Sequence, residues 1–324
     1  MIPEEVMRIA DDIRTMRIRG AGRIARAAAK ALKLAAEKYA GPDDVNEFVR
    51  YMEVVAETLL STRPTAVSLP NAVSYVMSRL RRQRPGSVKE ARSIVVRYAD
   101  EFIGYSLNAV RMIAEIGARR ITDGDAVLTH CNSSAAIAVI VEAWRSGKDI
   151  EVYATETRPR YQGLITVKML AEAGVEVTLV PDAAVRLLMK RLDKVIVGAD
   201  TVAANGAVVN KIGTAQIALA AKEANVDFYV AAETYKFSPA TVLGELVEIE
   251  ERPPTEVVDN SFLEKHPRVR VLNPAFDVTP PEYIDAIITE RGIIPPQAAF
   301  LVLKREYGQA IADYVIKATV DLED

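Results

Sequence analysis

The feature that most constrains the fold of this chain is a change in its hydrophobic pattern near residue 123. From residue 3 to about 118, apolar residues recur at helical spacing, and the alternation typical of strands is absent. After the sequence DGD at 123–125, short apolar runs alternate with longer helical stretches. This pattern predicts two domains, of which the first is built from helices alone.

The second part of the chain contains apolar runs that are typical of strands. They are residues 126–130, 150–155, 175–180, 194–199, 226–232 and 269–273. Helical stretches lie between them, at 133–147, 163–174, 183–192 and 213–225. Strands that alternate with helices favour a parallel sheet with helices on both faces. We therefore predict an all-helical N-terminal domain at 1–120 and a Rossmann-like α/β domain, with a mainly parallel, doubly wound sheet, at 121–324.

Turn-forming sequences divide the helical part of the chain. They are GPDD at 41–44, STRPT at 61–65 and RPGS at 84–87. At the first of them, Asp43 or Asp44 is expected to cap the helix that follows.

Composition limits the partners and the cellular location. Half of the 324 residues are hydrophobic and the net charge is -3, which predicts no general affinity for nucleic acid or anionic lipid. One cysteine excludes an intramolecular disulfide, and with two histidines it offers no spacing for a metal site. The acidic start and the lack of a long apolar run predict a soluble cytoplasmic protein without signal peptide or membrane span.

Polar clusters follow four of the predicted strands. They are THCNSS at 129–134, TETRPRYQG at 155–163, GADTVAANGAVVNKIGT at 198–214 and AETYKFS at 232–238. Because the carboxyl ends of parallel strands meet at one edge of a sheet, we expect these clusters to line a common ligand crevice.

The first cluster holds the single cysteine, Cys131, followed by Ser133 and Ser134. If a helix starts at these serines, its unpaired backbone N–H groups and the two hydroxyls form an anion site. The same field is expected to lower the pKa of the Cys131 thiol and favour the thiolate. The alternative is that Ser133 only caps the helix and Cys131 only fills space.

Asp200 directly follows an apolar strand. It is either a helix N-cap or an active-site acid, and apolar surroundings would make it a proton donor near neutral pH. Asn210 and Lys211 offer an amide and an ammonium group suited to a hydroxylated, phosphorylated ligand. Lys236 is a second candidate phosphate cation, with a solvated lysine as the alternative.

The helical domain contributes further candidates. Gly20 and Gly22 allow the backbone to approach a ligand closely, and Arg19 lies beside them. Arg63 could grip a phosphate with its guanidinium group. The basic segment 78–86 is interpreted as a solvated helix end rather than an RNA- or nucleotide-regulatory patch.

The motifs RGAGRIA, STRPT, THCNSSA, ETRPRYQG, VGADTVAANGAVVNKIGT and AETYKF, in this order, identify a family resemblance. The chain resembles the family that unites methylthioribose-1-phosphate isomerase, archaeal ribose-1,5-bisphosphate isomerase and regulatory subunits of the translation-initiation guanine-nucleotide exchange factor. The resemblance runs from about residue 14 to the end.

Two departures favour one branch of that family. The methylthioribose-phosphate isomerases read RGAP and C-N-x-G where this chain reads RGAG and CNSS. Two serines add hydroxyl donors for a second phosphate, so the chain looks like the ribose-1,5-bisphosphate isomerase branch, which acts in AMP and nucleoside breakdown. A methylthioribose-1-phosphate isomerase is the alternative enzyme. A non-catalytic exchange-factor-like subunit is the alternative of another class, although such subunits commonly lose the Cys/Asp pair.

The resemblance implies an aldose–ketose isomerization in which Cys131 is the base and Asp200 the acid. A hydride shift would use the same residues for electrostatics. The implied substrate-binding residues are Arg19, Gly20, Ala21, Gly22, Arg63, Ser133, Ser134, Ala135, Arg158, Asn210, Lys211 and Lys236. The implied partners are a sugar bisphosphate substrate, AMP as an activator, and copies of the same chain in a homo-oligomer, either a dimer or a hexameric trimer of dimers. No metal or organic cofactor is implied.

Overall fold

The computed structural model describes residues 1–63 and 67–320. Of residues 309, 310 and 313–320 it describes the backbone alone. The chain divides into two compact units, Met1–Ala109 and Val110–Asp324. The division falls inside helix α5 (Val88–Ala118). The domain boundary at residue 120 therefore stays a prediction.

Unit 1 consists of helices and their connections over residues 1–63 and 67–109, as predicted. Its helices are α1 (Glu4–Arg14), α2 (Ala21–Glu37), α3 (Val45–Leu60), α4 (Ser68–Gln83) and the first part of α5. Ile24, Leu32, Phe48 and Leu69 are almost completely buried, because the apolar residues of each helix share one face. Asp44 caps α3 by accepting hydrogen bonds from the backbone N–H groups of Asn46 and Glu47, at 2.8 and 3.0 Å.

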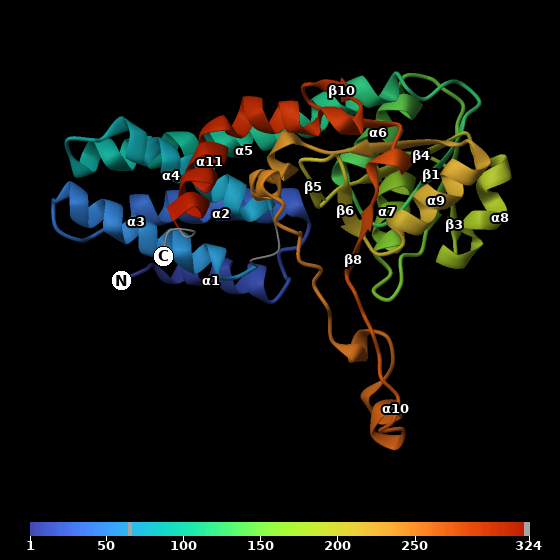
Figure 1. Cartoon of the computed structure of the whole chain (residues 1–324), viewed down its shortest axis with the longest axis horizontal. Helices are drawn as coiled ribbons and strands as arrows, with labels where there is room; N and C mark the ends of the chain where they lie inside the picture. The colour runs from blue at the N-terminus through green and yellow to red at the C-terminus, as the bar shows by residue number, and fades with distance from the viewer. Residues whose placement is uncertain (64–66, 321–324) are drawn as a thin grey trace. The chain divides into compact units, whose positions relative to one another are not determined.

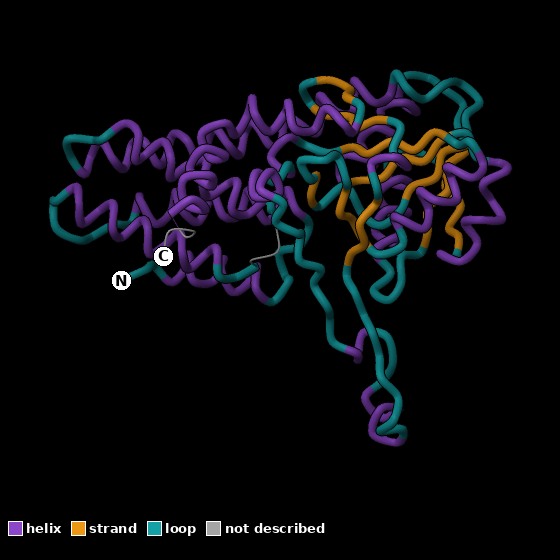
Figure 2. Tube along the Cα trace, in the orientation of Figure 1, coloured by secondary structure: helices purple, strands orange, loops and turns teal. Residues whose placement is uncertain are grey.

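Unit 2 is built on a seven-stranded sheet in the order β10-β9-β7-β4-β1-β2-β3 (Figures 1 and 2). Its strands are β1 (Ala126–Thr129), β2 (Glu151–Thr155), β3 (Val177–Val180), β4 (Lys194–Gly198), β7 (Asp227–Ala231), β9 (Ala286–Thr289) and β10 (Gly292–Ile294). Neighbouring strands are parallel except β9 and β10, which are antiparallel. The prediction of a mainly parallel sheet is confirmed.

Helices cover both faces of this sheet, which makes it doubly wound. They include α6 (Ser134–Arg145), α7 (Gln162–Glu172) and α9 (Thr214–Ala224), and α11 (Ala299–Val320) ends the described chain. Successive strand residues point to opposite faces. Leu128 therefore packs in one core with Ile217 of α9, whereas Val127 packs in the other with Ile140 of α6.

A second, three-stranded antiparallel sheet was not expected from the sequence. It contains β5 (Thr201–Val202), β6 (Val208–Lys211) and β8 (Phe276–Thr279), with β6 in the middle. The predicted strand at 269–273 is wrong. Those residues belong to an arm, roughly 245–275, that extends away from the sheet in Figure 1 and carries α10 (Asn260–Lys265). Val269 and Leu272 are 45% and 78% exposed there, so they have no core to pack against.

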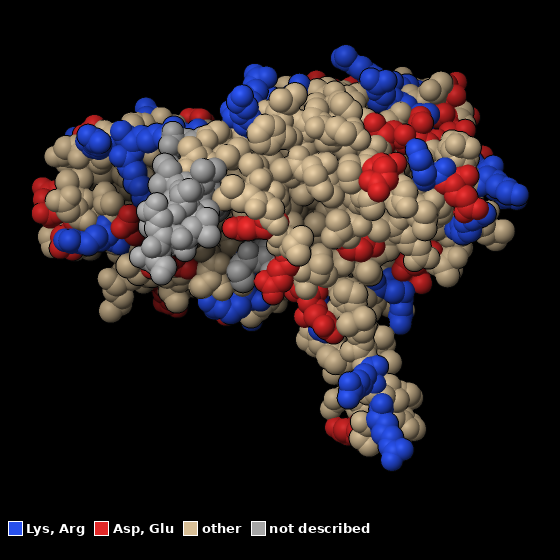
Figure 3. Space-filling view, in the orientation of Figure 1, with Lys and Arg blue, Asp and Glu red and all other residues tan. Residues whose placement is uncertain are grey.

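One predicted helix is shorter than expected. Residues 183–192 form α8 (Val185–Leu188) between the 3-10 turns Asp182–Ala184 and Met189–Arg191, not one continuous helix. Among the described residues, no helix is both long and apolar enough to cross a membrane. On the face drawn in Figure 3, acidic and basic side chains are intermixed instead of gathered in one basic patch.

Candidate active site

The carboxyl ends of β1, β2, β4 and β7 lie at one edge of the sheet, because these neighbours are all parallel. The polar clusters that follow the four strands therefore meet at this edge, as the sequence predicted. Cys131, Arg158, Asp200 and Lys236 belong to the loops found there.

The loop that carries Cys131 is held by two threonines. The Cys131 N–H donates to Thr157 Oγ1 at 3.0 Å, and its carbonyl accepts from Thr166 Oγ1 at 2.5 Å. Cys131 and Thr157 both adopt the left-handed backbone region, with φ of 64° and 60°. That region is costly for residues other than glycine and is concentrated at functional sites. The surroundings therefore fix Cys131 in a strained position.

The expected low pKa of Cys131 is not found. Burial raises the pKa of the thiol to about 11. The positive charge of Lys211 opposes this shift, whereas the charge of Asp200 adds to it. The Asn132 backbone N–H also acts to lower the pKa, but the lowering effects together do not outweigh the loss of solvent around the sulfur. Cys131 is thus a protonated thiol at neutral pH.

The start of α6 combines a side-chain cap with backbone N–H groups that the helix itself does not bond. Ser133 is the N-cap, and its Oγ accepts from the Ala136 N–H at 3.3 Å. Ser134 is exposed and Ala135 is buried, and both lie in the first turn, whose N–H groups have no partner within the helix. Ser133 also touches the end of β4, because a Cβ added to Gly198 would lie 2.5 Å from the Ser133 Cβ.

Asp200 lies two residues beyond that contact. Its backbone N–H donates to the Val209 carbonyl at 2.9 Å. It is followed by strand β5, so the alternative that it caps a helix is wrong. Its carboxylate acts on both the Cys131 thiol and the Lys211 ammonium group. These three groups are therefore electrostatically coupled.

Asn210 and Lys211 are buried on β6, before α9 begins. Asn210 Nδ2 donates to Thr214 Oγ1 at 3.0 Å. The Lys211 ammonium lies 4.6 Å from the centre of the Phe276 ring, and burial lowers its pKa. A buried cation of this kind gains from an anionic ligand.

Lys236 is also buried, and it has a partner within the protein. Its ammonium forms a 2.6 Å ion pair with Glu233. Burial acts to raise the pKa of Glu233, but the charge of Lys236 and the hydrogen bonds of the carboxylate outweigh it and lower the pKa overall. The alternative of a solvated lysine is wrong.

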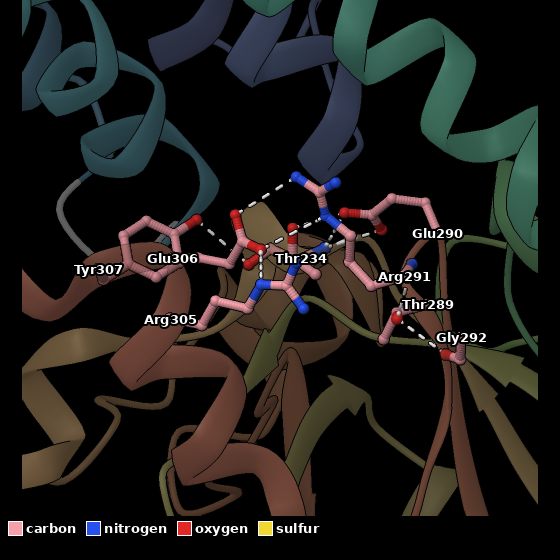
Figure 4. A network of polar contacts seen from close by, with 8 residues as sticks. All are labelled: Thr234, Thr289, Glu290, Arg291, Gly292, Arg305, Glu306 and Tyr307. Atoms are coloured by element: carbon pink, nitrogen blue, oxygen red, sulfur yellow. Dashed lines mark hydrogen bonds and ion pairs between the residues drawn. The ribbon is translucent and has the colours of Figure 1, made fainter.

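The 3-10 turn Thr234–Lys236 is held at Thr234 by a polar network (Figure 4). Glu290, at the end of β9, accepts from the Thr234 N–H at 3.1 Å and from its Oγ1 at 2.5 Å. Tyr307 of α11 donates its hydroxyl to the Thr234 carbonyl at 3.1 Å. Arg291 forms an ion pair with Glu306, which joins the β9–β10 turn to α11.

Among the four candidates in the loops at this edge, which are Cys131, Arg158, Asp200 and Lys236, Arg158 is the exposed residue. Its backbone N–H donates to Asp182 Oδ2 at 2.7 Å, which anchors the loop after β2. Its guanidinium group donates to the Tyr161 hydroxyl and lies 5.0 Å from the centre of the Tyr161 ring.

The candidates of unit 1 gather at the starts of two helices. Gly20 precedes α2 with a φ of 90°, and Ala21 and Gly22 begin that helix. The Ala21 carbonyl accepts from Ser68 Oγ at 2.9 Å, which places the start of α2 beside the start of α4. Arg19 and Arg63 are partly buried in the segments that lead to these helices. The rest of the STRPT motif, residues 64 and 65, lies outside the described part.

His130 has a structural role beside the candidate site. Its ring nitrogens contact Thr155 Oγ1 at 2.6 Å and the Ile212 carbonyl at 2.9 Å. Burial lowers the pKa of this histidine to about 4. The neutral ring therefore links β1, β2 and the loop that leads into α9.

Sequence reasoning missed three residues that act on Cys131: Thr157 and Thr166 through hydrogen bonds, and Arg252 through its charge. Thr157 stands inside the ETRPRYQG motif and could have been noticed there. Thr166 lies within a helix, and Arg252 lies in a segment between elements. Only the folded chain brings these two to the site.

Comparison with known proteins assigns the family. The model of the initiation factor 2 subunit family matches residues 17–296. The chain belongs to this family. An Archaeoglobus fulgidus member named ribose 1,5-bisphosphate isomerase is 57% identical and covers 95% of this chain and 95% of that protein.

Two other members represent the remaining branches. An Acetivibrio thermocellus protein named methylthioribose-1-phosphate isomerase is 41% identical and covers 89% of this chain and 87% of that protein. The crystal structure of Pyrococcus horikoshii translation initiation factor eIF-2B superposes with a TM-score of 0.78 at 34% identity. It covers 91% of this chain and 98% of that one. The branch with the bisphosphate isomerase name has the highest identity of these three.

Proposed function

We propose that this chain is an aldose–ketose isomerase that converts ribose 1,5-bisphosphate to ribulose 1,5-bisphosphate. The observation that carries the proposal is the electrostatic coupling of Cys131, Asp200 and Lys211 at the carboxyl edge of the sheet. The positions of the three residues in the chain support the proposal, because Cys131 follows β1, Asp200 follows β4 and α/β sheets bind ligands beyond the carboxyl ends of their strands. The 57% identity to the Archaeoglobus relative supports the bisphosphate as substrate.

In the proposed reaction, Asp200 donates a proton to the ring oxygen, and the bond from that oxygen to C1 breaks. The thiolate of Cys131 takes the proton from C2, so that a double bond forms between C1 and C2. The same proton returns to C1, and the C2 hydroxyl gives its proton back to Asp200. Every atom is then accounted for, and both residues regain their starting state.

The phosphates need cations and hydrogen-bond donors. In unit 2, Lys211, Lys236, Arg158, Asn210 and the start of α6 would supply them. Arg19, Gly20, Ala21, Gly22 and Arg63 of unit 1 are the remaining proposed ligands.

The burial of Cys131 has a consequence for catalysis. A thiol with a pKa near 11 is a strong base once ionized, but little thiolate exists at neutral pH. Lys211 favours the thiolate, so its charge is part of the proposed machinery.

Turnover of the purified chain tests the proposal. Ribose 1,5-bisphosphate is incubated with and without AMP, and ribulose 1,5-bisphosphate is followed by phosphorus NMR. Its formation is the expected result, and faster formation with AMP would support AMP as an activator. No product under either condition rejects the assignment. Exclusive turnover of methylthioribose 1-phosphate would establish the alternative enzyme, and binding without turnover of either sugar would favour a regulatory subunit.

The proposal extends to assembly and location: a cytoplasmic homo-oligomer, either a dimer or a trimer of dimers. Light scattering after size-exclusion chromatography measures the mass directly, and a monomer at micromolar concentration would reject this part.

A further inference from the structure

Arg252 is a buried guanidinium group that the protein leaves incompletely bonded. The residue is 8% exposed, and neither its Nε nor its Nη1 has a hydrogen-bond partner. Glu250 Oε1 lies 3.2 Å from Nε, close enough for an ion pair, but the pair lacks the geometry of a hydrogen bond. Burying a charge with unused donors destabilizes a protein, so such a group is retained where a ligand completes its bonding.

The backbone places Arg252 beside the strand that supports Lys211. At the base of the arm, the Arg252 N–H donates to the Asn273 carbonyl at 2.9 Å, and the Ala275 N–H donates to the Glu250 carbonyl at 2.8 Å. The chain continues from there into β8, where Phe276 is the register partner of Lys211. Residues 250–252, which form the base of the arm, and strand β6 are therefore both paired with one short segment, residues 273–276.

The charges agree with this placement. Arg252 acts to lower the pKa of the Cys131 thiol and of the Lys211 ammonium, as a nearby cation does. Two cations held close together and away from solvent repel each other, and an anion between them removes that repulsion. The planar guanidinium group of arginine can bind a phosphate through two parallel N–H···O hydrogen bonds, a geometry that suits phosphate recognition.

We propose that Arg252 is a phosphate ligand of the active site and, together with Lys211, binds one phosphate of the sugar bisphosphate. The inference rests on the proposed function and adds a residue that no sequence motif indicated. It also gives the base of the arm a role in substrate binding.

Binding in the absence of turnover tests the inference. Ribose 1,5-bisphosphate is titrated calorimetrically into a Cys131→Ser chain with and without Arg252→Met. The second substitution is expected to weaken binding by at least about tenfold. Arg270→Met, at an exposed arginine of the same arm, is the matched control and should leave the affinity unchanged.

The melting temperature of the ligand-free chain separates a ligand from a structural residue. Arg252→Met should leave it unchanged or raise it, because methionine removes an incompletely bonded buried charge. An affinity within about twofold of the Cys131→Ser chain overturns the proposal. A lowered melting temperature also overturns it, because Arg252 would then be holding the fold together. If Arg252→Met does not fold, Arg252→Lys is measured instead: weakened binding is expected, and unchanged affinity overturns the proposal.

Failure of the proposed function gives a different result. In that case the unsubstituted chain neither converts nor binds the bisphosphate. Inorganic phosphate then serves as the probe for Arg252: weaker binding after Arg252→Met supports the phosphate site, and equal or undetectable binding in both chains overturns it.

Discussion

The backbone N–H of Cys131 donates a 3.0 Å hydrogen bond to Thr157 Oγ1, and both residues hold left-handed backbone conformations. The bond joins the loop after β1 to the loop after β2. Each strained loop is therefore stabilized by the other, and the position of the candidate base depends on a residue from the next strand.

Thr157→Val tests this dependence. Valine keeps the branched shape but removes the hydroxyl group that accepts the Cys131 N–H. We expect kcat to fall about tenfold and the free energy of unfolding to fall by about 1 kcal/mol. Initial rates and denaturant unfolding measure the two effects. Thr178→Val, at an exposed strand position, is the control, and equal losses in both variants would contradict the prediction.

Gly198→Ala tests the close contact between β4 and the start of α6. The added methyl group would lie 2.5 Å from the Ser133 Cβ, so rotating the serine hydroxyl cannot relieve the overlap. We expect a loss of about 1–3 kcal/mol in the free energy of unfolding, measured by urea denaturation. Gly104→Ala, where a methyl group meets nothing within 4 Å in a helix, should be neutral or stabilizing. A neutral Gly198→Ala would show that Ser133 moves freely.

Cys131→Ser and Asp200→Asn test the assigned acid and base. Each should lower kcat by a factor of about 10² or more while the affinity for the bisphosphate changes little, because each group acts on protons instead of phosphates. Steady-state kinetics and calorimetry measure the two quantities. Substantial activity in Cys131→Ser would remove Cys131 from the role of base.

The rate of alkylation by iodoacetamide should report the raised pKa of Cys131. Because this is the single cysteine of the chain, the signal belongs to one group. The rate is expected to climb with pH and to reach half of its maximum near pH 11. The chain unfolded in guanidinium chloride, whose thiol ionizes near pH 9, is the control. A rate that levels off below pH 9 in the folded protein would show an activated thiolate instead.

His130 should make stability depend on pH. Burial lowers its pKa from 6.5 to about 4, so the unfolded chain binds a proton at a higher pH than the folded chain does. Its contribution is complete above pH 6.5 and is lost as the pH falls toward 4, by about 3 kcal/mol. Asp277, whose pKa burial raises to about 6, gives a slope of opposite sign. The quantity to measure is therefore the difference in unfolding free energy between the unsubstituted chain and His130→Gln, which should shrink over that range. A constant difference would contradict the prediction.

The local pattern was sufficient for the helical N-terminal part and for half of the described strands, whereas β5, β6, β8, β9 and β10 were not predicted. Five predicted strands appear within one or two residues of their expected bounds, because strands with helices on both faces of the sheet leave short continuous apolar runs in the sequence. The error at 269–273 has the same origin. Val269 and Leu272 have the composition of a strand, but they lie in an exposed arm with no sheet to join.

The location of the candidate site could be predicted from the sequence, but the chemical state of its residues could not. The sequence located the polar ends of the strands, because the geometry of a parallel sheet brings carboxyl ends together whatever the loops contain. It misjudged the pKa of Cys131, because the desolvation of a thiol is a sum over neighbours from many segments. It also left Asp200 ambiguous, since a cap and an acid look alike until the next element proves to be a strand.

The sequence by itself determined the two kinds of architecture, five strands of the main sheet and the family, because each is written in local periodicity and in short motifs. The tertiary structure decided the second sheet, the hold of Thr157 and Thr166 on Cys131, the buried pairing of Lys236 with Glu233, and the position of Arg252 beside β8. These depend on contacts between residues far apart in the chain, and such contacts form only when the whole core closes around them.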